Sequence, residues 1–173
     1  DIYKERALPK LLHALADIKG LEWIRLHYAY PSKFPLEILD VMKERDKICN
    51  YLDMPLQHAS NNMLKAMKRQ ITREEMEELI GAIRNKIPEI CIRTTLIAGF
   101  PGETREDVDE LKSFLQKMQF DRVGIFTYSH EEQTSAYNLE DTVTAEEKEE
   151  RAQEIMELQQ EISLEKNTQK IGT

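Results

Sequence analysis

Hydrophobic and polar positions along the chain follow two different periods, and the changes of period divide the chain into helices and strands. Runs with apolar residues every three or four positions predict amphipathic helices over residues 4–19, 35–45, 61–69, 72–87, 104–118 and 144–166. Short runs of apolar and aromatic residues predict strands over residues 21–30, 50–56, 90–98 and 123–128. Strands therefore alternate with helices along almost the whole chain.

Start and stop signals support several of these boundaries. Thr72 with Glu75, and Thr144 with Glu147, have the spacing of a capping box, and Thr104 is placed to cap a third helix. The alternation of strands and amphipathic helices predicts an α/β fold with right-handed crossovers and a parallel sheet. Four strands make half of an eight-stranded barrel or a small open sheet. Because the chain starts on a helix and without Met, we expect a piece of a larger barrel-like domain.

Charge and composition narrow the class of protein. The chain has 173 residues, of which 40% are hydrophobic and 32% charged, as in a globular domain. The net charge of −8 comes entirely from residues 131–173, because residues 1–130 carry equal numbers of basic and acidic side chains. That balance argues against a broad nucleic-acid-binding face, which needs a basic excess. No apolar run is long enough for a membrane span and no secretory signal opens the chain, so we expect a cytoplasmic protein.

The two cysteines are Cys49 and Cys91, and neither has a neighbour at a metal-ligand spacing. Both lie among apolar residues. We expect reduced, buried thiols of a cytosolic protein.

Candidate chemistry collects where the predicted strands end, because sites of parallel α/β folds form at the carboxyl ends of strands. His27, His58 and His130 lie at three such ends, and the turn 99–103 lies at the fourth. The three histidines could bind a metal, although polar residues also collect wherever strands leave a core. The fourth histidine, His13, lies on a helix and is expected to be structural.

Three further features have two interpretations each. Glycines in the turn 99–103 could let backbone approach an anionic ligand, or could simply form a tight turn. Arg93 lies inside an apolar strand, where it could bind a ligand carboxylate or pair with an internal acid such as Asp53. The basic cluster of Lys65, Lys68, Arg69 and Arg73 is typical of a solvated helix face.

Several motifs in order give the chain a resemblance to a known family. The segments Tyr51-Leu52-Asp53-Met54-Pro55-Leu56-Gln57-His58-Ala59-Ser60, Leu64-Lys65-Ala66-Met67-Lys68-Arg69 and Ile97-Ala98-Gly99-Phe100-Pro101-Gly102-Glu103-Thr104 resemble the radical S-adenosylmethionine (SAM) methylthiotransferases. The similarity continues at residues 26–31 and 158–163 and covers essentially the whole chain. Within the family it looks like the RimO-type branch. The tRNA-modifying, MiaB-like branch typically has Ser-Gly-Ser after the glutamine and an acidic residue where this chain has Thr95.

The resemblance implies a partial, six-stranded (βα) barrel of radical SAM type, of which this chain supplies strands three to six. Residues 1–143 would be the later part of the barrel. The acidic helix 144–173 would lead toward a small TRAM domain. Family members bind two [4Fe–4S] clusters, one through C-x-x-x-C-x-x-C, and this chain contains neither set of ligands. The chain would thus be a catalytic-domain fragment, inactive alone and possessing an uncovered edge that favours self-association.

The resemblance also implies a function and a site. The enzyme would use SAM to methylthiolate the β-carbon of an aspartate on small-subunit ribosomal protein S-twelve. Gln57 and Ser60 would face the ribose or methionine part of SAM, and Arg93 its carboxylate. The backbone at Ile97 to Gly99 and at Phe126 to Tyr128 would line the adenine. The alternatives are a tRNA-adenosine methylthiotransferase, a non-catalytic α/β interaction module, and a metal-dependent hydrolase that uses the three histidines.

Overall fold

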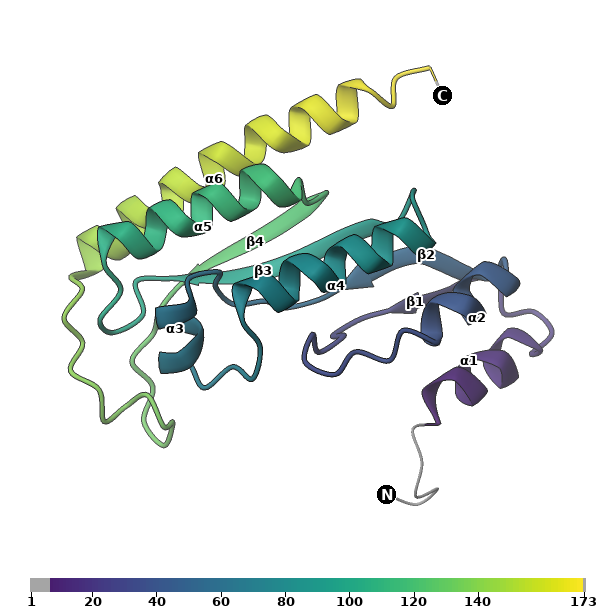
Figure 1. Ribbon diagram of the computed structural model, residues 1–173, viewed down its shortest axis with the longest axis horizontal. Helices are drawn as coiled ribbons and strands as arrows, with labels where there is room; N and C mark the ends of the chain where they lie inside the picture. The colour runs from purple at the N-terminus through teal and green to yellow at the C-terminus, as the bar shows by residue number, and fades with distance from the viewer. Residues whose placement is uncertain (1–6, 173) are drawn as a thin grey trace.

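A computed structural model describes residues 7–172, and within them the chain forms a four-stranded sheet with six helices (Figure 1). The elements are, in order, α1 (Leu8–Ala16), β1 (Ile24–Leu26), α2 (Ile38–Glu44), β2 (Ile48–Asp53), α3 (Asn61–Ala66), α4 (Arg73–Lys86), β3 (Cys91–Ala98), α5 (Arg105–Met118), β4 (Arg122–Thr127) and α6 (Ala145–Thr168). The sequence predicted this order of elements, and it is confirmed. No helix of the described residues is long and apolar enough to cross a bilayer.

The sheet is parallel throughout, and its strand order β1-β2-β3-β4 follows the order of the chain. Each pair of neighbouring strands is joined through at least one helix, as parallel pairing requires. A sheet whose strands run in chain order without reversing is one sector of a (βα) barrel. The predicted α/β class and partial barrel are therefore confirmed.

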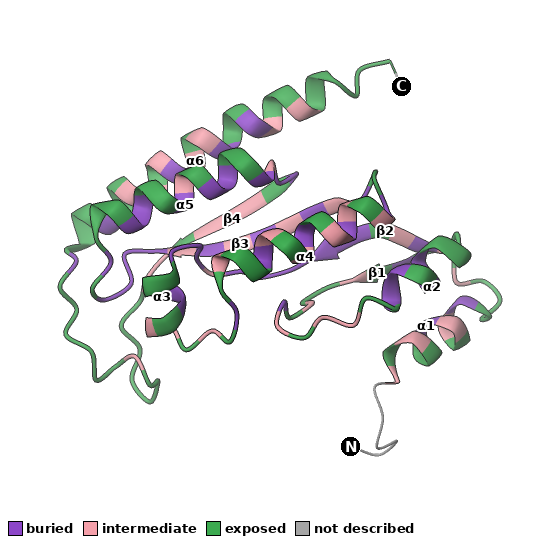
Figure 2. Ribbon diagram, in the orientation of Figure 1, coloured by how far each residue is buried: buried purple, intermediate pink, exposed green. Residues whose placement is uncertain are grey.

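The two faces of the sheet differ in burial. Along β3 every second residue is buried, starting at Ile92, and the residues between them are half-buried (Figure 2). The buried residues face the helices, whose apolar stripes form the core. The half-buried set includes Arg93, Thr95 and Ile97, and it lies on the opposite face, which we call the open face. The sequence placed these residues together by the two-residue period of a strand.

Three helices begin with the same local device. Thr72, Thr104 and Thr144 each accept a hydrogen bond from the backbone N–H three residues on, and the acid at that position bonds back to the threonine N–H. Such a capping box satisfies two of the backbone donors that a helix leaves without a partner. The predicted caps of α4, α5 and α6 are confirmed.

Several predicted boundaries were wrong. The strand predicted over 21–30 is only Ile24–Leu26, since Tyr28 has a left-handed φ of 63° that interrupts an extended chain. The strand predicted over 50–56 runs from Ile48 to Asp53. Beyond it, Pro55 has no N–H to donate to the ladder. The predicted helix 4–19 is Leu8–Ala16, while residues 4–6 lie outside the described range.

The remaining helices are also shorter or longer than predicted by a few residues, as at 35–45 and 61–69, where the helices span 38–44 and 61–66. Both thiols are free, but they are half-buried, so the prediction of buried cysteines was wrong. Partial burial still raises the pKa of the Cys91 thiol, and the nearby Asp121 carboxylate raises it further.

Candidate functional site

The open face carries a charged cluster where the end of β2 pairs with the first half of β3. Arg93 and Asp53 are register partners on these strands, and Arg93 Nη1 donates to Asp53 Oδ2 at 2.8 Å. His27 Nδ1 lies 3.4 Å from the same carboxylate oxygen. The internal ion pair that the sequence allowed is thus present. Because the Arg93 side chain remains 37% exposed and Asp53 engages only one of its terminal nitrogens, the guanidinium still faces the open side.

An apolar platform continues the open face toward the carboxyl end of the sheet. Ile97 is the register partner of Phe126, and the Phe126 side chain is 59% exposed. Two residues earlier on each strand, Thr95 is the register partner of Gly124. Arg93 and Phe126 flank this glycine, since a Cβ built on it would lie 3.5 Å from Arg93 Nη2 and 3.8 Å from the edge of the Phe126 ring. A flat ligand with an anionic end finds here an apolar surface beside a guanidinium.

Gln57 extends the sheet beyond β2 in an unusual conformation. Its N–H donates to Thr95 O at 2.9 Å and its carbonyl accepts from Ile97 N at 2.8 Å. Gln57 also has φ of 74°, in the left-handed region that glutamine rarely adopts. These two hydrogen bonds make Gln57 the bridge partner of Leu96, and they fix its backbone at the carboxyl end of the sheet.

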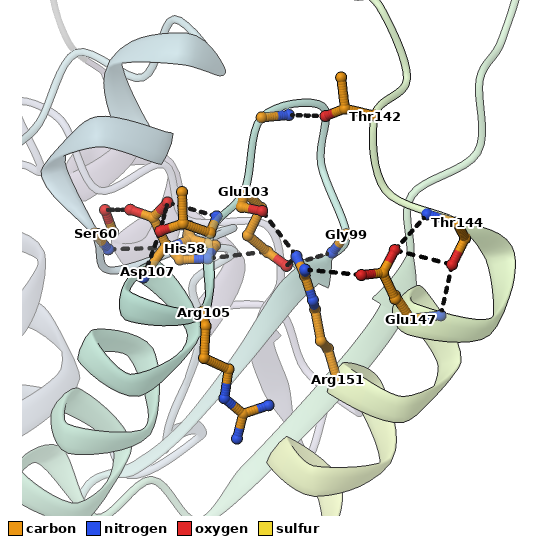
Figure 3. Close-up of polar contacts among 12 residues, drawn as sticks. His58, Ser60, Gly99, Glu103, Arg105, Asp107, Thr142, Thr144, Glu147 and Arg151 are labelled. Atoms are coloured by element: carbon orange, nitrogen blue, oxygen red, sulfur yellow. Dashed lines mark hydrogen bonds and ion pairs between the residues drawn. The ribbon is translucent and has the colours of Figure 1, made fainter.

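Behind the open face, a buried network joins the end of β2 to the turn after β3 (Figure 3). His58 and Glu103 both have fully buried side chains, and His58 Nε2 lies 3.3 Å from Glu103 Oε1. His58 Nδ1 accepts from the Ser60 N–H at 2.9 Å, so its proton resides on Nε2, which donates to Glu103. Both nitrogens of the imidazole therefore have hydrogen-bond partners.

The other oxygen of Glu103 fixes two further groups. Oε2 accepts from the Gly99 N–H and from Arg151 Nη1, both at 2.9 Å. Arg151 belongs to α6, so this carboxylate ties the last helix to the turn (Figure 3). Gly99 has φ of 75°, and a Cβ there would lie 2.1 Å from Lys148 Cγ. Glycine at this position is therefore required both by backbone conformation and by the close approach of α6.

Ser60 lies in the same buried region and contacts α5. Its side chain is buried, and its hydroxyl donates to Asp107 Oδ1 on α5. Burial favours a raised pKa for Asp107, but hydrogen bonds from Ser60 and Thr104 outweigh it and hold the pKa below its usual range. The predicted site residue Ser60 therefore acts on α5, and its hydroxyl is engaged away from the open face.

The predicted site residues thus fall into two groups. Arg93, Ile97 and Phe126 share the open face, and Gln57 lines a hollow together with Ile97, whereas Gly99 and Ser60 belong to the buried network. Tyr128 lies just after β4, where its N–H donates to Ala98 O at 2.8 Å and its ring packs edge-on against Phe100. Sequence reasoning missed Asp107, although its position three residues after Thr104 has the spacing of a capping box. It also missed Arg151, which no local pattern distinguishes from other helix-surface charges.

The four histidines have separate surroundings. His27 pairs with Asp53, His58 with Glu103, and His130 Nδ1 lies 3.3 Å from Tyr128 Oη. His13 Nδ1 accepts from Arg45 Nε, in keeping with the structural role predicted for it. Within residues 7–172 no group of three or more potential ligands could hold a metal ion, so the alternative of a histidine-based metal hydrolase finds no support.

Two hollows lie at opposite ends of the sheet. One of about 450 Å³ lies at the carboxyl ends of the strands and includes Gln57 and Ile97 in its wall. A larger one of about 560 Å³ lies at the amino ends, between Ile48 and Pro88. Parallel α/β folds place their ligands at the carboxyl ends of strands, so the smaller hollow is the candidate site.

Comparison with known proteins agrees with this geometry. Residues 4–115 match the Radical SAM superfamily. The chain belongs to the Radical SAM superfamily. The open face is therefore the inner face of a radical SAM barrel, and the hollow at the carboxyl ends lies at the mouth of that barrel.

Relatives within this superfamily carry a common name. The chain is 59% identical over 172 residues to the ribosomal protein uS12 methylthiotransferase RimO of Cytophaga hutchinsonii, covering 99% of this chain and 39% of that protein. It is 56% identical to the protein of the same name from Christiangramia forsetii, with 99% and 38% covered, and 50% identical to that from Bacteroides thetaiotaomicron, with 99% and 40% covered. The chain spans about two-fifths of the length of the relatives it matches.

Solved structures support the fold. Coproporphyrinogen III oxidase (HemN) from Escherichia coli, a radical SAM enzyme, superposes with a TM-score of 0.69 at 22% identity, covering 90% of this chain and 36% of that one. The radical SAM methyltransferase TsrM from Kitasatospora setae gives a TM-score of 0.53 at 22% identity, covering 68% and 23%. Both support the partial-barrel fold of this chain.

The residues of this chain suit SAM but not a [4Fe–4S] cluster. An exposed aromatic ring beside a half-exposed guanidinium on the open face suits the adenine and carboxylate of SAM. A [4Fe–4S] cluster needs several thiolate ligands. Cys49 and Cys91 are the two cysteines of this sequence, and they cannot supply such a set. The open face therefore has side chains suited to SAM, whereas this sequence lacks the thiolates that a cluster needs.

Proposed function

We propose that this chain forms the later strands of the catalytic barrel of an enzyme that methylthiolates the β-carbon of an aspartate on ribosomal protein uS12. The observation that carries the proposal is the identity of 50–59% to relatives of that name, over 99% of this chain. The full enzyme would act in the cytoplasm, with two [4Fe–4S] clusters held by residues outside this chain.

The chain's own part is to bind and orient SAM. One SAM molecule would supply the methyl group, and reductive cleavage of a second would supply the radical that abstracts hydrogen. Arg93 holds the methionine carboxylate with the nitrogens that Asp53 leaves available. Phe126 and Ile97 pack against the adenine, with the backbone at Gly99 and Tyr128 along its edge. Gln57 contacts the ribose or methionine part, and Ser60 supports the site indirectly through Asp107.

A tRNA substrate is disfavoured by the charge of this part of the chain. Residues 1–130 carry no net charge, whereas a surface that binds the phosphate backbone needs an excess of Lys and Arg. The activity itself is tested by incubating the full-length, anaerobically reconstituted protein with SAM, a one-electron reductant, sulfide as the sulfur source, and a uS12 peptide that contains the target aspartate. Mass spectrometry should find one hydrogen of that aspartate replaced by a methylthio group. An unmodified peptide would contradict the proposal.

The role of Arg93 is tested by Arg93→Lys, which keeps the charge and removes the planar fork. We expect SAM binding to weaken about tenfold, or ~1.4 kcal/mol, in calorimetric titration. The melting temperature should change little, because a half-exposed ion pair contributes only about 1 kcal/mol or less. Arg122→Lys is the control, since Arg122 is the exposed register partner of Arg93 at the start of β4. Unchanged SAM affinity with a lowered melting temperature would remove Arg93 from the site.

A further inference from the structure

The hollow at the carboxyl ends of the strands, which we call the rim cavity, has a basic wall. It is lined by Tyr28, Gln57, Ala66, Met67, Lys68, Arg69, Ile97, Phe100, Ser135, Ala136 and Leu139. Among these lining residues the charged ones are Lys68 and Arg69, and none is acidic. Figure 1 shows α3 and the segment that follows β4 at the same end of the sheet, and residues at the end of α3 and in that segment line the cavity. A cavity of this kind suits an anionic group.

Lys68 occupies a backbone position that favours glycine. The Lys68 N–H donates to Lys65 O at 3.0 Å and the Arg69 N–H donates to Leu64 O at 2.8 Å. With φ of 56° at Lys68, these bonds form a Schellman motif at the end of α3. The residue after the C-cap of this motif is usually glycine, because other side chains are strained there. Lysine is strained at this position, and its side chain lies at the mouth of the barrel.

Strain of this kind concentrates at the rim cavity. Six non-glycine residues of the described chain have positive φ, and three of them, Tyr28, Gln57 and Lys68, line this one cavity. Backbone strain persists where the surrounding structure imposes it, and it clusters at functional sites. The three residues come from segments up to 40 positions apart, so no single turn explains their convergence.

Arg69 is already engaged in building the wall. Its Nη2 donates to Pro55 O at 2.8 Å, and its guanidinium lies 4.6 Å from the centre of the Tyr30 ring. Its Nε is buried without a hydrogen-bond partner among the described residues. Lys68 is exposed, and its ammonium is carried on a flexible stem. Lys68 is thus the cation of this wall with the reach to meet an incoming ligand.

We infer that Lys68 binds the side-chain carboxylate of the substrate aspartate at the rim cavity, an assignment that rests on the proposed function. The cavity shares Gln57 and Ile97 with the surface assigned to SAM, so a residue held by Lys68 lies next to the cofactor. An ion pair with the carboxylate leaves the adjacent β-carbon as the group presented to the cofactor. The methionine part of SAM also carries a carboxylate, and separate titrations with SAM and with peptide distinguish the two sources.

The test uses Lys68→Gly in the full-length reconstituted protein, because glycine relieves the backbone while removing the ammonium. We expect the melting temperature to rise by about 2–4 °C. Binding of a fluorescent uS12 peptide should weaken about tenfold in anisotropy titrations. A second peptide with Asn in place of the target Asp should bind wild type about tenfold more weakly than the Asp peptide, and should bind Lys68→Gly as well as the Asp peptide does. Lys68→Arg should restore discrimination between the peptides.

Gln119→Gly is the matched control. Gln119 also has a left-handed φ, 50°, at the end of α5, and it lies far along the chain from the rim cavity and outside its lining. This variant should relieve strain in the same way and leave peptide binding unchanged. Equal discrimination between the Asp and Asn peptides in wild type and Lys68→Gly would overturn the assignment. So would a loss of SAM affinity in Lys68→Gly with peptide binding intact, which would identify the SAM carboxylate as the partner.

Failure of the proposed function gives a different result. If wild type leaves the target aspartate unmodified in mass spectrometry, the proposed function is wrong and the assignment of the carboxylate falls with it. If wild type modifies the peptide while Lys68→Gly binds and discriminates as wild type does, only the role of Lys68 is wrong.

Discussion

Replacing Glu103 with glutamine is the sharpest test of the buried network behind the site. The Glu103 side chain has no exposed surface, and its two oxygens accept from His58 Nε2, the Gly99 N–H and Arg151 Nη1. Glutamine has nearly the same volume, so packing is preserved. One of its polar ends is an NH₂ donor, however, and in either orientation it meets a group that also donates.

The magnitude follows from what glutamine leaves without a partner. A hydrogen bond to a charged group contributes about 1.5–3 kcal/mol, and a buried donor without an acceptor costs about 1–3 kcal/mol. The Arg151 side chain is only 13% exposed, so water cannot replace the lost carboxylate fully. Arg151 keeps the Glu103 backbone carbonyl at 2.9 Å as a remaining acceptor. We therefore expect Glu103→Gln to lower the free energy of unfolding by about 3 kcal/mol.

The assay is urea unfolding of the full-length protein, followed by far-UV circular dichroism in the transition of this domain. Glu147→Gln is the matched control, because Glu147 lies 3.9 Å from the same guanidinium but is about half exposed. Glutamine also preserves the capping box at that position, so the change should stay below about 0.5 kcal/mol. The double variant Glu103→Gln with Arg151→Met should lose less free energy of unfolding than the sum of the losses in the two single variants. We expect the difference to be about 2 kcal/mol. A Glu103→Gln variant within about 0.5 kcal/mol of wild type would refute this reasoning.

Two further predictions concern backbone strain and pH. Gly99→Ala should destabilise the fold by about 2 kcal/mol or more in the same unfolding assay, since φ is 75° and the new methyl would lie 2.1 Å from Lys148 Cγ. The control Gly81→Ala should stabilise the fold by about 1 kcal/mol, because Gly81 lies in a helix and its new methyl would have nothing within 4 Å. Equal effects at the two glycines would contradict this. Hydrogen bonds from Arg105 lower the pKa of Glu154 from 4.5 to about 2, so this pair contributes stability above pH 4.5 that is lost as the pH falls toward 2. Because Arg105 is about half exposed, we expect about 1 kcal/mol or less, absent in Glu154→Gln; an acid unfolding curve identical to wild type in that variant would exclude the contribution.

Local signals identified most of the fold because they act within a few residues. The capping boxes at Thr72 and Thr144 fix where helices begin, and each involves a contact only three positions away. The two-residue period of the strand containing Arg93 placed Ile97 on the same face without any knowledge of its neighbours. Strand lengths were less accessible, because the left-handed φ of Tyr28 depends on how its loop packs.

The candidate site divides in the same way. Gln57 and Gly99 follow predicted strands, and ligand sites of parallel α/β folds lie at the carboxyl ends of strands. The sequence could therefore indicate both residues. The sequence alone predicted a parallel sheet of radical SAM type, with the candidate site at the carboxyl ends of its strands. The tertiary structure alone decided which charges are buried together. Glu103 and Arg151 lie 48 positions apart, and only the packing of α6 against the turn removes both from water and makes their pairing necessary.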